Sequence, residues 1–174
     1  MTDRKPVKTR NLDIYGSGEL ARDTSRDALI AALPRPETAV FLGTVRPDGR
    51  PHAAGVGALW YDGDLYFTSG PGTRKSRDLA ANPACSLSVR APGVDLVFEG
   101  EAARVTDPAV LEPVAAGYRE GGWPARVDGD ALTAPFSAQS AGPPPWHVYR
   151  LAFRTAVGVA TAEPFGASHW TFPA

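Results

Sequence analysis

Apolar residues occur in short runs along most of this chain, separated by glycine, proline and polar residues. Runs of this length and composition predict β-strands rather than long helices. Turn sequences such as Asp62-Gly63 connect neighbouring runs and indicate an antiparallel meander. Strands are expected at residues 38–45, 51–61, 65–69, 84–90, 96–105, 146–153, 156–161 and 168–172. The pattern predicts a mainly β (α+β) fold with a few helices, built on a closed or nearly closed barrel.

Three other segments have the apolar spacing of helices, and they are expected at residues 24–33, 73–82 and 107–118. Thr24 and Thr73 are placed to cap the first two helices, and Asp107-Pro108 is a typical start for the third. Residues 1–18 show no clear period. We therefore expect an N-terminal arm and helix over residues 1–36 and a barrel over residues 37–174, within a single domain.

Glycines inside two of the expected strands predict local features of the backbone. Gly55 and Gly57 are two residues apart, so in one strand they would share a face and leave room for a ligand or another backbone. Gly100 stands between Glu99 and Glu101 in the run at 96–105, where we expect a bulge or bend.

Residues 64–83 combine a strand, a glycine turn and a helix start. The turn would bring together the hydroxyls of Thr68, Ser69 and Thr73, the cations Arg74, Lys75 and Arg77, and free backbone N–H groups. Helix N-termini and charge-assisted hydrogen bonds both favour a phosphate. A solvated basic helix start on an ordinary loop is the alternative interpretation. The spacing is not that of a Walker A loop, so nucleoside triphosphate hydrolysis has no support.

Composition narrows the class of protein. The formal net charge of −1 argues against a nucleic-acid-binding protein. No apolar run approaches the length of a transmembrane helix, and the polar N-terminus argues against a signal peptide. The single cysteine, Cys85, fits a reducing cytoplasm and is interpreted as a packed strand residue rather than a catalytic thiol. No metal site is predicted.

Residues 121–145 show no steady period and include Trp123 and Phe136, with Trp146 directly after them. Loops of this length inside a domain are usually functional or disordered, and the aromatic residues favour a packed, functional loop. Tyr118, Trp123 and Phe136 would shape a substrate pocket, although packing in the core explains them equally well.

Four segments together resemble one family of proteins. They are the hairpin at 38–61 with Arg46-Pro-Asp-Gly-Arg-Pro-His52, the segment at 65–83, the strand at 98–105 and the ending at 167–172. In their order and spacing these segments are similar to the pyridoxamine 5′-phosphate oxidase-like, FMN-binding split-barrel family, the flavin and deazaflavin oxidoreductases. The resemblance covers residues 38–172, most of the chain.

The resemblance implies a six-stranded antiparallel split β-barrel that forms a homodimer with the cofactor at the subunit interface. It implies that Arg74 and Lys75 hold the cofactor phosphate, helped by Thr68, Ser69 and Thr73. The residues that would pass the ring system are His52, Ala54, Gly55, Val56 and Gly57. Trp170 and the partner subunit's Trp146 would wall the pocket.

Two departures from the family pattern limit what is carried over. The terminal motif of close relatives reads Thr-Arg-Trp, whereas this chain has Ser168-His169-Trp170. The C-terminal signature of pyridoxamine phosphate oxidases themselves is also absent, so vitamin B6 oxidation is not the expected reaction. The cofactor expected first is the deazaflavin coenzyme F-420, with FMN as the alternative. The anionic tail of F-420 needs a basic rim, for which the candidates are Arg22, Arg26, Arg50 and Arg77.

The function expected from this resemblance is an oxidoreductase that transfers a hydride between the cofactor and a small unsaturated or planar substrate. Because the cofactor ring performs that chemistry, no acid–base pair is required. His52 and His169 are the candidates for a proton donor. The alternative is a non-catalytic protein that binds or stores flavin, haem or a related tetrapyrrole. No nucleic acid or membrane is expected among the partners.

Overall fold

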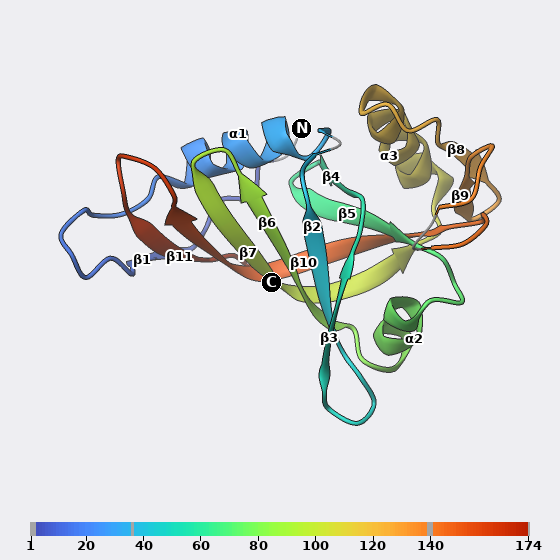
Figure 1. Cartoon of the computed structure of the whole chain (residues 1–174), viewed down its shortest axis with the longest axis horizontal. Coiled ribbons are helices and arrows are strands. Elements are labelled where there is room, and N and C mark those ends of the chain that lie inside the picture. Colours follow the sequence, from blue (N-terminus) through green and yellow to red (C-terminus); the bar gives the residue numbers. More distant parts are fainter. Residues whose placement is uncertain (1–2, 36, 139–140, 174) are drawn as a thin grey trace.

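One large antiparallel sheet organises the molecule, with helices packed at its ends and edges (Figure 1). The structure is a computed structural model that describes residues 3–35, 37–138 and 141–173. In chain order the elements are β1 (Lys8–Asn11), α1 (Arg22–Ala32), β2 (Val40–Val45), β3 (Pro51–Gly55), β4 (Ala58–Tyr61), β5 (Asp64–Ser69), α2 (Arg74–Ala81), β6 (Ala84–Ala91), β7 (Val94–Val105), α3 (Pro108–Glu120), β8 (Arg126–Asp128), β9 (Ala131–Thr133), β10 (His147–Ala160) and β11 (Ala167–Thr171).

The 14-residue strand β10 divides the sheet. Its first half lies between β5 and β7, and its second half lies between β11 and β7. From β10 the order continues through β7, β6, β2 and β3, while β4 pairs with β5. Figure 1 shows β10 crossing the molecule from the side of β1 and β11 to the side of α3. This is the expected antiparallel split barrel, although its largest sheet has nine strands, so the expected count of six is not confirmed.

Strand β5 is buried on both faces, which explains its unbroken apolar run. Leu65 and Phe67 face the main core, together with Leu29 of α1 and Phe153 of β10. Tyr66 faces the other way, into a second core built mainly by α3. The apolar stripe of α3 therefore covers the outside of β5 and the first half of β10.

Two of the three expected helix starts are confirmed. The Thr73 hydroxyl accepts a hydrogen bond from the Ser76 backbone N–H at 3.4 Å, and the Asp107 carboxylate accepts one from the Ala109 N–H at 2.9 Å. The predicted cap at Thr24 is wrong. Helix α1 begins at Arg22, and its N-cap residue, Ala21, makes no side-chain cap. Thr24 is therefore the third residue of the helix and lies inside its first turn, too late in the sequence to be the N-cap.

The single strand expected at residues 51–61 is also wrong. The structure divides it into β3, which pairs with β2, and β4, which pairs with β5. Between them the Val56 N–H still bonds the Val40 carbonyl, after which the chain turns toward β5. Gly55 and Gly57 therefore flank a corner of the barrel and do not share one face of a strand. Glycine suits such a bend because it lacks a Cβ.

The expected bulge lies on the neighbouring strand. Residues 146–153 and 156–161 form one strand, β10, whose register shifts between Phe153 and Thr155. Strand β7 runs through Gly100 without a break. A Cβ at Gly100 would lie 2.3 Å from the Ala152 carbonyl oxygen, so the glycine allows β10 to come close at this shift.

Two segments that were expected to lack regular structure contain strands. In the N-terminal arm, β1 pairs with β11 and extends the sheet beyond the barrel. Between 121 and 145, β8 and β9 form a small separate hairpin that packs beside α3. Residues 1–2, 36, 139–140 and 174 lie outside the described residues. Among the helices of the described ranges, none is long and apolar enough to cross a membrane.

Candidate functional site

A cavity of about 230 Å³ opens where α2, α3, β5 and the corner between β3 and β4 meet. Six of the predicted cofactor-binding residues line it: Gly55, Val56, Gly57, Thr68, Lys75 and Trp146. Trp146 was expected from the partner subunit, whereas here it belongs to the same chain as the other five. The remaining described lining residues are Tyr118, Trp123, Ala138 and Ala141. Residues from widely separated parts of the chain thus converge on one space.

Lys75 supplies the positive charge of this cavity. Only 4% of Lys75 is exposed, and its ammonium has no ion-pair or hydrogen-bond partner among the described residues. Burial lowers the pKa of Lys75, because a charged amine is poorly solvated there. Arg74 precedes it on α2 and points to solvent. Consecutive helical residues differ by about 100° in direction, so only one of this pair can face the cavity.

Three hydroxyls behind the cavity bond to one another. The Ser69 hydroxyl lies 2.9 Å from that of Thr73 and 2.7 Å from that of Ser76. Thr73 and Ser76 each donate to the Gly70 carbonyl at 2.9 Å. The network fixes the turn between β5 and α2, and thereby the direction of Lys75. Thr68 is the predicted hydroxyl residue that lines the cavity itself.

The loop that contains Ala141 packs directly against the turn between β5 and α2. A Cβ at Gly70 would lie 2.3 Å from the Ala141 carbonyl oxygen, so a side chain at this position would push the loop away. Ala138 and Ala141 form part of the cavity wall because of this close approach. Sequence reasoning missed both alanines. Gly70 was the available signal, since glycine often marks such close contacts.

Aromatic rings form the opposite wall. The rings of Tyr118 and Trp123 meet edge to face with centroids 5.0 Å apart, and those of Trp123 and Trp146 lie 5.4 Å apart. The Tyr118 hydroxyl donates to the Gly57 carbonyl at 3.0 Å, which ties α3 to the barrel corner. Burial raises the pKa of the Tyr118 phenol, so this group stays neutral at physiological pH. The wall is therefore rigid and uncharged.

Other predicted site residues lie outside the cavity lining. His52 and Ala54 are half-buried on β3, and Phe136 is largely exposed. His169 lies on β11, paired with Arg10 and Val157. The structure brings neither histidine into the cavity, so no imidazole faces it from the described residues.

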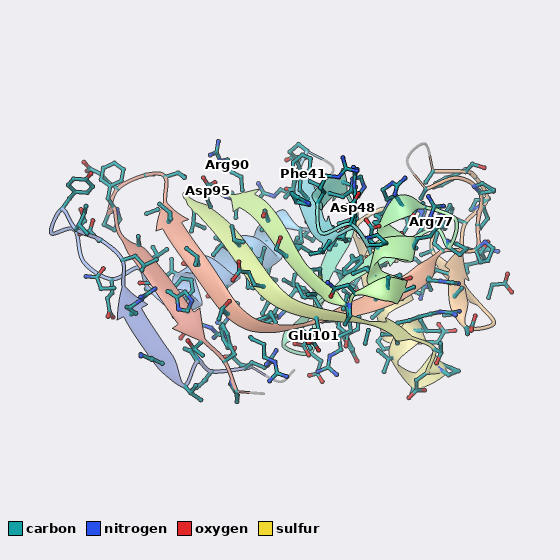
Figure 2. The ribbon with its side chains drawn as sticks, turned by 90° about the horizontal axis from the view of Figure 1, so that it is seen from below. Phe41, Asp48, Arg77, Arg90, Asp95 and Glu101 are labelled. Carbon is teal, nitrogen blue, oxygen red and sulfur yellow. The ribbon has the colours of Figure 1, made fainter. Side chains whose placement is uncertain are left out.

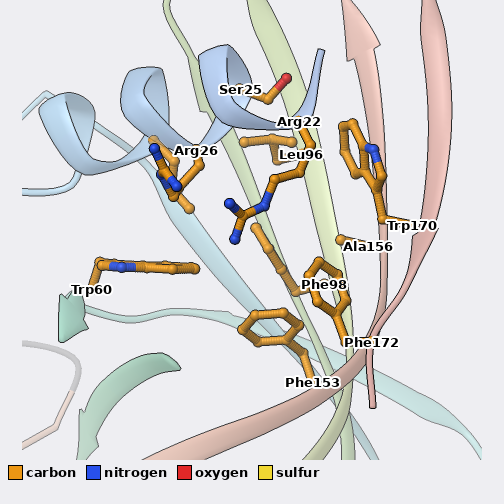
Figure 3. Close-up of a pocket in the computed structure, with 11 residues that line it drawn as sticks. Arg22, Ser25, Arg26, Trp60, Leu96, Phe98, Phe153, Ala156, Trp170 and Phe172 are labelled. Atoms are coloured by element: carbon orange, nitrogen blue, oxygen red, sulfur yellow. The ribbon is translucent and has the colours of Figure 1, made fainter. Parts of the chain in front are cut away.

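Trp170 lies in a different part of the fold. It lines a small pocket at the other end of the barrel, with Arg22 and Arg26 of α1 pointing toward a ring of aromatic side chains (Figure 3). The free space there is about 20 Å³, which holds little more than one water molecule. Both arginines pair with the Asp3 carboxylate, at 2.6 and 2.7 Å.

The other two arginines expected at the rim, Arg50 and Arg77, have different partners. Arg50 pairs with Asp48 at 2.6 Å. Arg77 donates to the Gly72 carbonyl at 2.8 Å, with no carboxylate partner among the described residues. Of the four candidates, Arg77 is thus the one whose charge remains available beside α2.

The cavity combines a cation that has no partner among the described residues, glycine backbone and an aromatic wall. No carboxylate or imidazole appears among its described lining residues, so the side chains there that could move a proton are Lys75 and Tyr118. A buried ammonium stabilises an anionic group, while aromatic rings pack against a planar one. The arrangement suits a planar ligand that carries a phosphate or a carboxylate.

Comparisons with known proteins agree with the fold. A protein from Clostridium acetobutylicum, related to general stress protein 26 of B. subtilis, has a TM-score of 0.60 at 15% identity, over 86% of this chain and 92% of that chain. A pyridoxamine 5'-phosphate oxidase-related, FMN binding protein from Nostoc punctiforme has a TM-score of 0.55 at 19% identity, over 85% and 89%. A heme binding protein from Mycobacterium smegmatis has a TM-score of 0.58 at 15% identity, over 85% and 58%.

At these identities the solved structures show the shared fold. No curated protein matches the chain. The family described as Pyridoxamine 5'-phosphate oxidase matches residues 27–160, which is more than half of the sequence and includes the whole segment from β2 to β9. By this match and by its split-barrel fold, the chain belongs to the pyridoxamine 5'-phosphate oxidase family.

Proposed function

We propose that the cavity binds a flavin-type cofactor and that the protein transfers a hydride between this cofactor and a small unsaturated or planar organic molecule. The observation that carries the proposal is the unpartnered ammonium of Lys75, buried between glycine backbone and an aromatic wall. Family membership supports a flavin-type cofactor, and a neighbour of the same fold is an FMN binding protein. Coenzyme F-420 is our first choice and FMN the alternative.

The residues present fit such a group. Lys75 would hold a phosphate oxygen, and Thr68 would add a hydroxyl donor from β5. At Gly55 a Cβ would meet no atom of the described residues within 4 Å, so the cavity has open space beside the backbone there. Tyr118 and Trp146 would orient the ring system by packing against it.

When bound, the cofactor ring supplies the hydride chemistry. The protein would contribute by positioning the cofactor and the substrate and by shielding them from bulk solvent. Trp146 is 1% exposed and Tyr118 is 8% exposed, so the fold shields this side of the cavity from bulk solvent. Tyr118 keeps its proton because of its raised pKa, and its hydroxyl holds the Gly57 carbonyl. Backbone near Gly57 is therefore fixed before any ligand arrives.

We also propose that a second copy of the chain completes the site. Drug-sized ligand pockets usually enclose about 300–1,000 Å³, whereas this cavity holds about 230 Å³. The outer face of the sheet carries Phe41 with 52% of its surface exposed, next to Gly55 in the register of β2 and β3. Light scattering should report a homodimer. A monomer with full cofactor affinity would exclude an interface site.

A cofactor titration tests the leading choice. The protein is purified without added cofactor and titrated with F-420 and with FMN, using fluorescence as the readout. We expect colourless protein that binds F-420 more tightly than FMN. Replacing Arg74 and Lys75 with alanine should weaken either complex by about 1.5–3 kcal/mol, the value of one charge-assisted bond, because only Lys75 faces the cavity. Unchanged affinity would mean that the phosphate binds elsewhere.

The second candidate function is non-catalytic binding or storage of a flavin or tetrapyrrole. A neighbour of the same fold is a heme binding protein, which favours this function. Turnover distinguishes the two functions. Bound reduced cofactor should be reoxidised by an electron acceptor faster than free cofactor if the protein is an enzyme, and not if it is a storage protein.

A further inference from the structure

A second cleft lies on the other side of α2. Lys75 faces the cofactor cavity, whereas Ser76 and Arg77 line a groove of about 410 Å³ between α2, β7 and β10. The two spaces share no described lining residue. We call the second one the basic groove and define it by Arg77, Arg104, His147 and Tyr149.

Positive charge dominates the basic groove. Arg77 and Arg104 line it, and no aspartate or glutamate is found among its described lining residues. Arg104 pairs with Asp130 at 2.7 Å, from a carboxylate that is itself more than half exposed. Arg77 bonds a backbone carbonyl, and no carboxylate among the described residues pairs with it. One guanidinium charge is thus left without a counter-charge beside the groove.

Tyr149 gives the groove a fixed polar group. Its ring stacks on Phe67 with centroids 5.3 Å apart and planes 8° apart. Tyr149 is 8% exposed, and its hydroxyl has no hydrogen-bond partner among the described residues. In the described part of the chain, two side-chain polar atoms are inaccessible to solvent and lack a hydrogen bond: Arg46 Nε and Trp146 Nε1. The Tyr149 oxygen is not one of them. The Tyr149 hydroxyl therefore keeps access to the groove and is free to donate.

His147 completes the constellation from the start of β10. It lies on the same face of the strand as Tyr149, with ring centroids 6.5 Å apart. Burial and the nearby charge of Arg104 lower the pKa of His147. A neutral imidazole still donates one hydrogen bond. An anion in the groove would meet two guanidinium groups, a phenol and an imidazole.

We propose that the basic groove binds a phosphate or carboxylate group, at a site separate from the cofactor cavity. Arg77 and Arg104 supply charge-assisted hydrogen bonds, and Tyr149 fixes the position of the anion. Two sources have this chemistry: a separate phosphorylated or carboxylated small molecule, and the glutamate tail of F-420 reaching around α2. The groove would bind the anionic group of either source through the same residues.

The test uses inorganic phosphate and pyrophosphate as probes, titrated calorimetrically into the protein without cofactor. Titration is repeated in Lys75→Met, which removes the cation of the cofactor cavity, so that the remaining binding reports on the groove. We expect saturable binding there. Arg77→Ala should raise the Kd about tenfold, as the loss of one charge-assisted bond implies. Tyr149→Phe keeps the ring stacked on Phe67 and should raise the Kd about threefold.

Arg90→Ala is the matched control. Arg90 is an exposed arginine paired with Asp95, well separated from Arg77 in Figure 2. The substitution Arg90→Ala removes the same net charge as Arg77→Ala but lies outside the groove, so the Kd for phosphate should not change. Non-saturating binding, or equal weakening in Arg77→Ala and Arg90→Ala, would overturn the proposal, because the anion would then respond only to overall charge.

Competition separates the two sources. FMN has a phosphate but no glutamate tail, so saturating FMN should leave phosphate binding at the groove intact. Displacement of phosphate by F-420 but not by FMN would identify the tail as the groove's ligand. Binding that persists with either cofactor would identify a separate small molecule. The phosphate titration in cofactor-free protein stands even if neither cofactor binds the cavity.

Discussion

Replacing Lys75 with methionine should make the protein more stable and less able to bind its cofactor. Lys75 is 4% exposed and has no partner among the described residues, so folding removes much of the water around its ammonium without supplying a protein hydrogen bond in return. Methionine has a similar length, no charge and a flexible apolar side chain. We expect the free energy of unfolding to rise by about 1 kcal/mol at neutral pH, within the usual gain of roughly 0.5–2 kcal/mol for such changes.

The effect should depend on pH in a defined direction. Burial lowers the pKa of Lys75 below its value of about 10.4 in the unfolded chain. Between these two values the unfolded state binds more protons, so wild-type stability rises with pH. The penalty is fully present below the folded pKa and disappears as pH rises toward about 10.4. The advantage of Lys75→Met should therefore shrink at alkaline pH.

Urea denaturation followed by tryptophan fluorescence, from neutral pH to about pH 10, measures this difference. Arg74→Met is the control, since Arg74 is the exposed neighbour on α2 and its loss should change stability by less than about 0.5 kcal/mol. A gain of 1 kcal/mol corresponds to a rise of about 2–4 °C in Tm for a chain of this size. Lower stability of Lys75→Met at neutral pH, with Arg74→Met unchanged, would refute the reasoning.

Cofactor binding gives the second half of this prediction. A ligand that binds the folded state raises stability in proportion to its affinity. Saturating cofactor should stabilise wild-type protein more than Lys75→Met, by about 1.5–3 kcal/mol, the value of one hydrogen bond to a charged group. Equal stabilisation of both proteins would show that Lys75 does not hold the phosphate.

Three further predictions follow from the packing. Gly70→Ala should lose about 1–3 kcal/mol of stability, because its Cβ would lie 2.3 Å from a carbonyl oxygen. Gly72→Ala, whose Cβ would meet no atom of the described residues within 4 Å, should be nearly neutral by urea denaturation. The hydrogen bond from Arg22 lowers the pKa of Asp3 to about 2, so wild type should be more stable than Asp3→Asn at neutral pH, and acid denaturation should show this gap closing as pH falls from about 4 to 2. Burial raises the pKa of the Cys85 thiol to about 12, so a thiol reagent at about pH 8 should label it only after unfolding.

Local signals in the sequence determined two of the three helix starts and several of the strands. Thr73 and Asp107 cap α2 and α3 as expected, because a cap depends on a side chain and a backbone N–H only two or three residues away. The apolar run of β5 was correctly interpreted as a buried strand. Such features are settled by neighbours along the chain, so the sequence is enough to predict them.

Sequence alone also predicted the region of the candidate site. The glycine turn and helix start at 64–83 do form one wall of the cavity, through Thr68 and Lys75. The aromatic residues of the long loop supply the opposite wall, through Trp123 and Trp146. The family motifs in this segment were informative because one continuous stretch contributes the strand, the turn and the helix.

Tertiary structure alone decided which side chains meet. Arg74 and Lys75 are equivalent in the sequence, but the packing of α2 against the barrel turns one to solvent and the other into the cavity. The corner at Gly55 and Gly57 exists because β3 and β4 pair with different strands, which no local pattern indicates. Trp170 lies at the far end of the barrel. Distances between residues far apart in sequence depend on strand order and register, which are set by the burial of the whole sheet rather than by short segments.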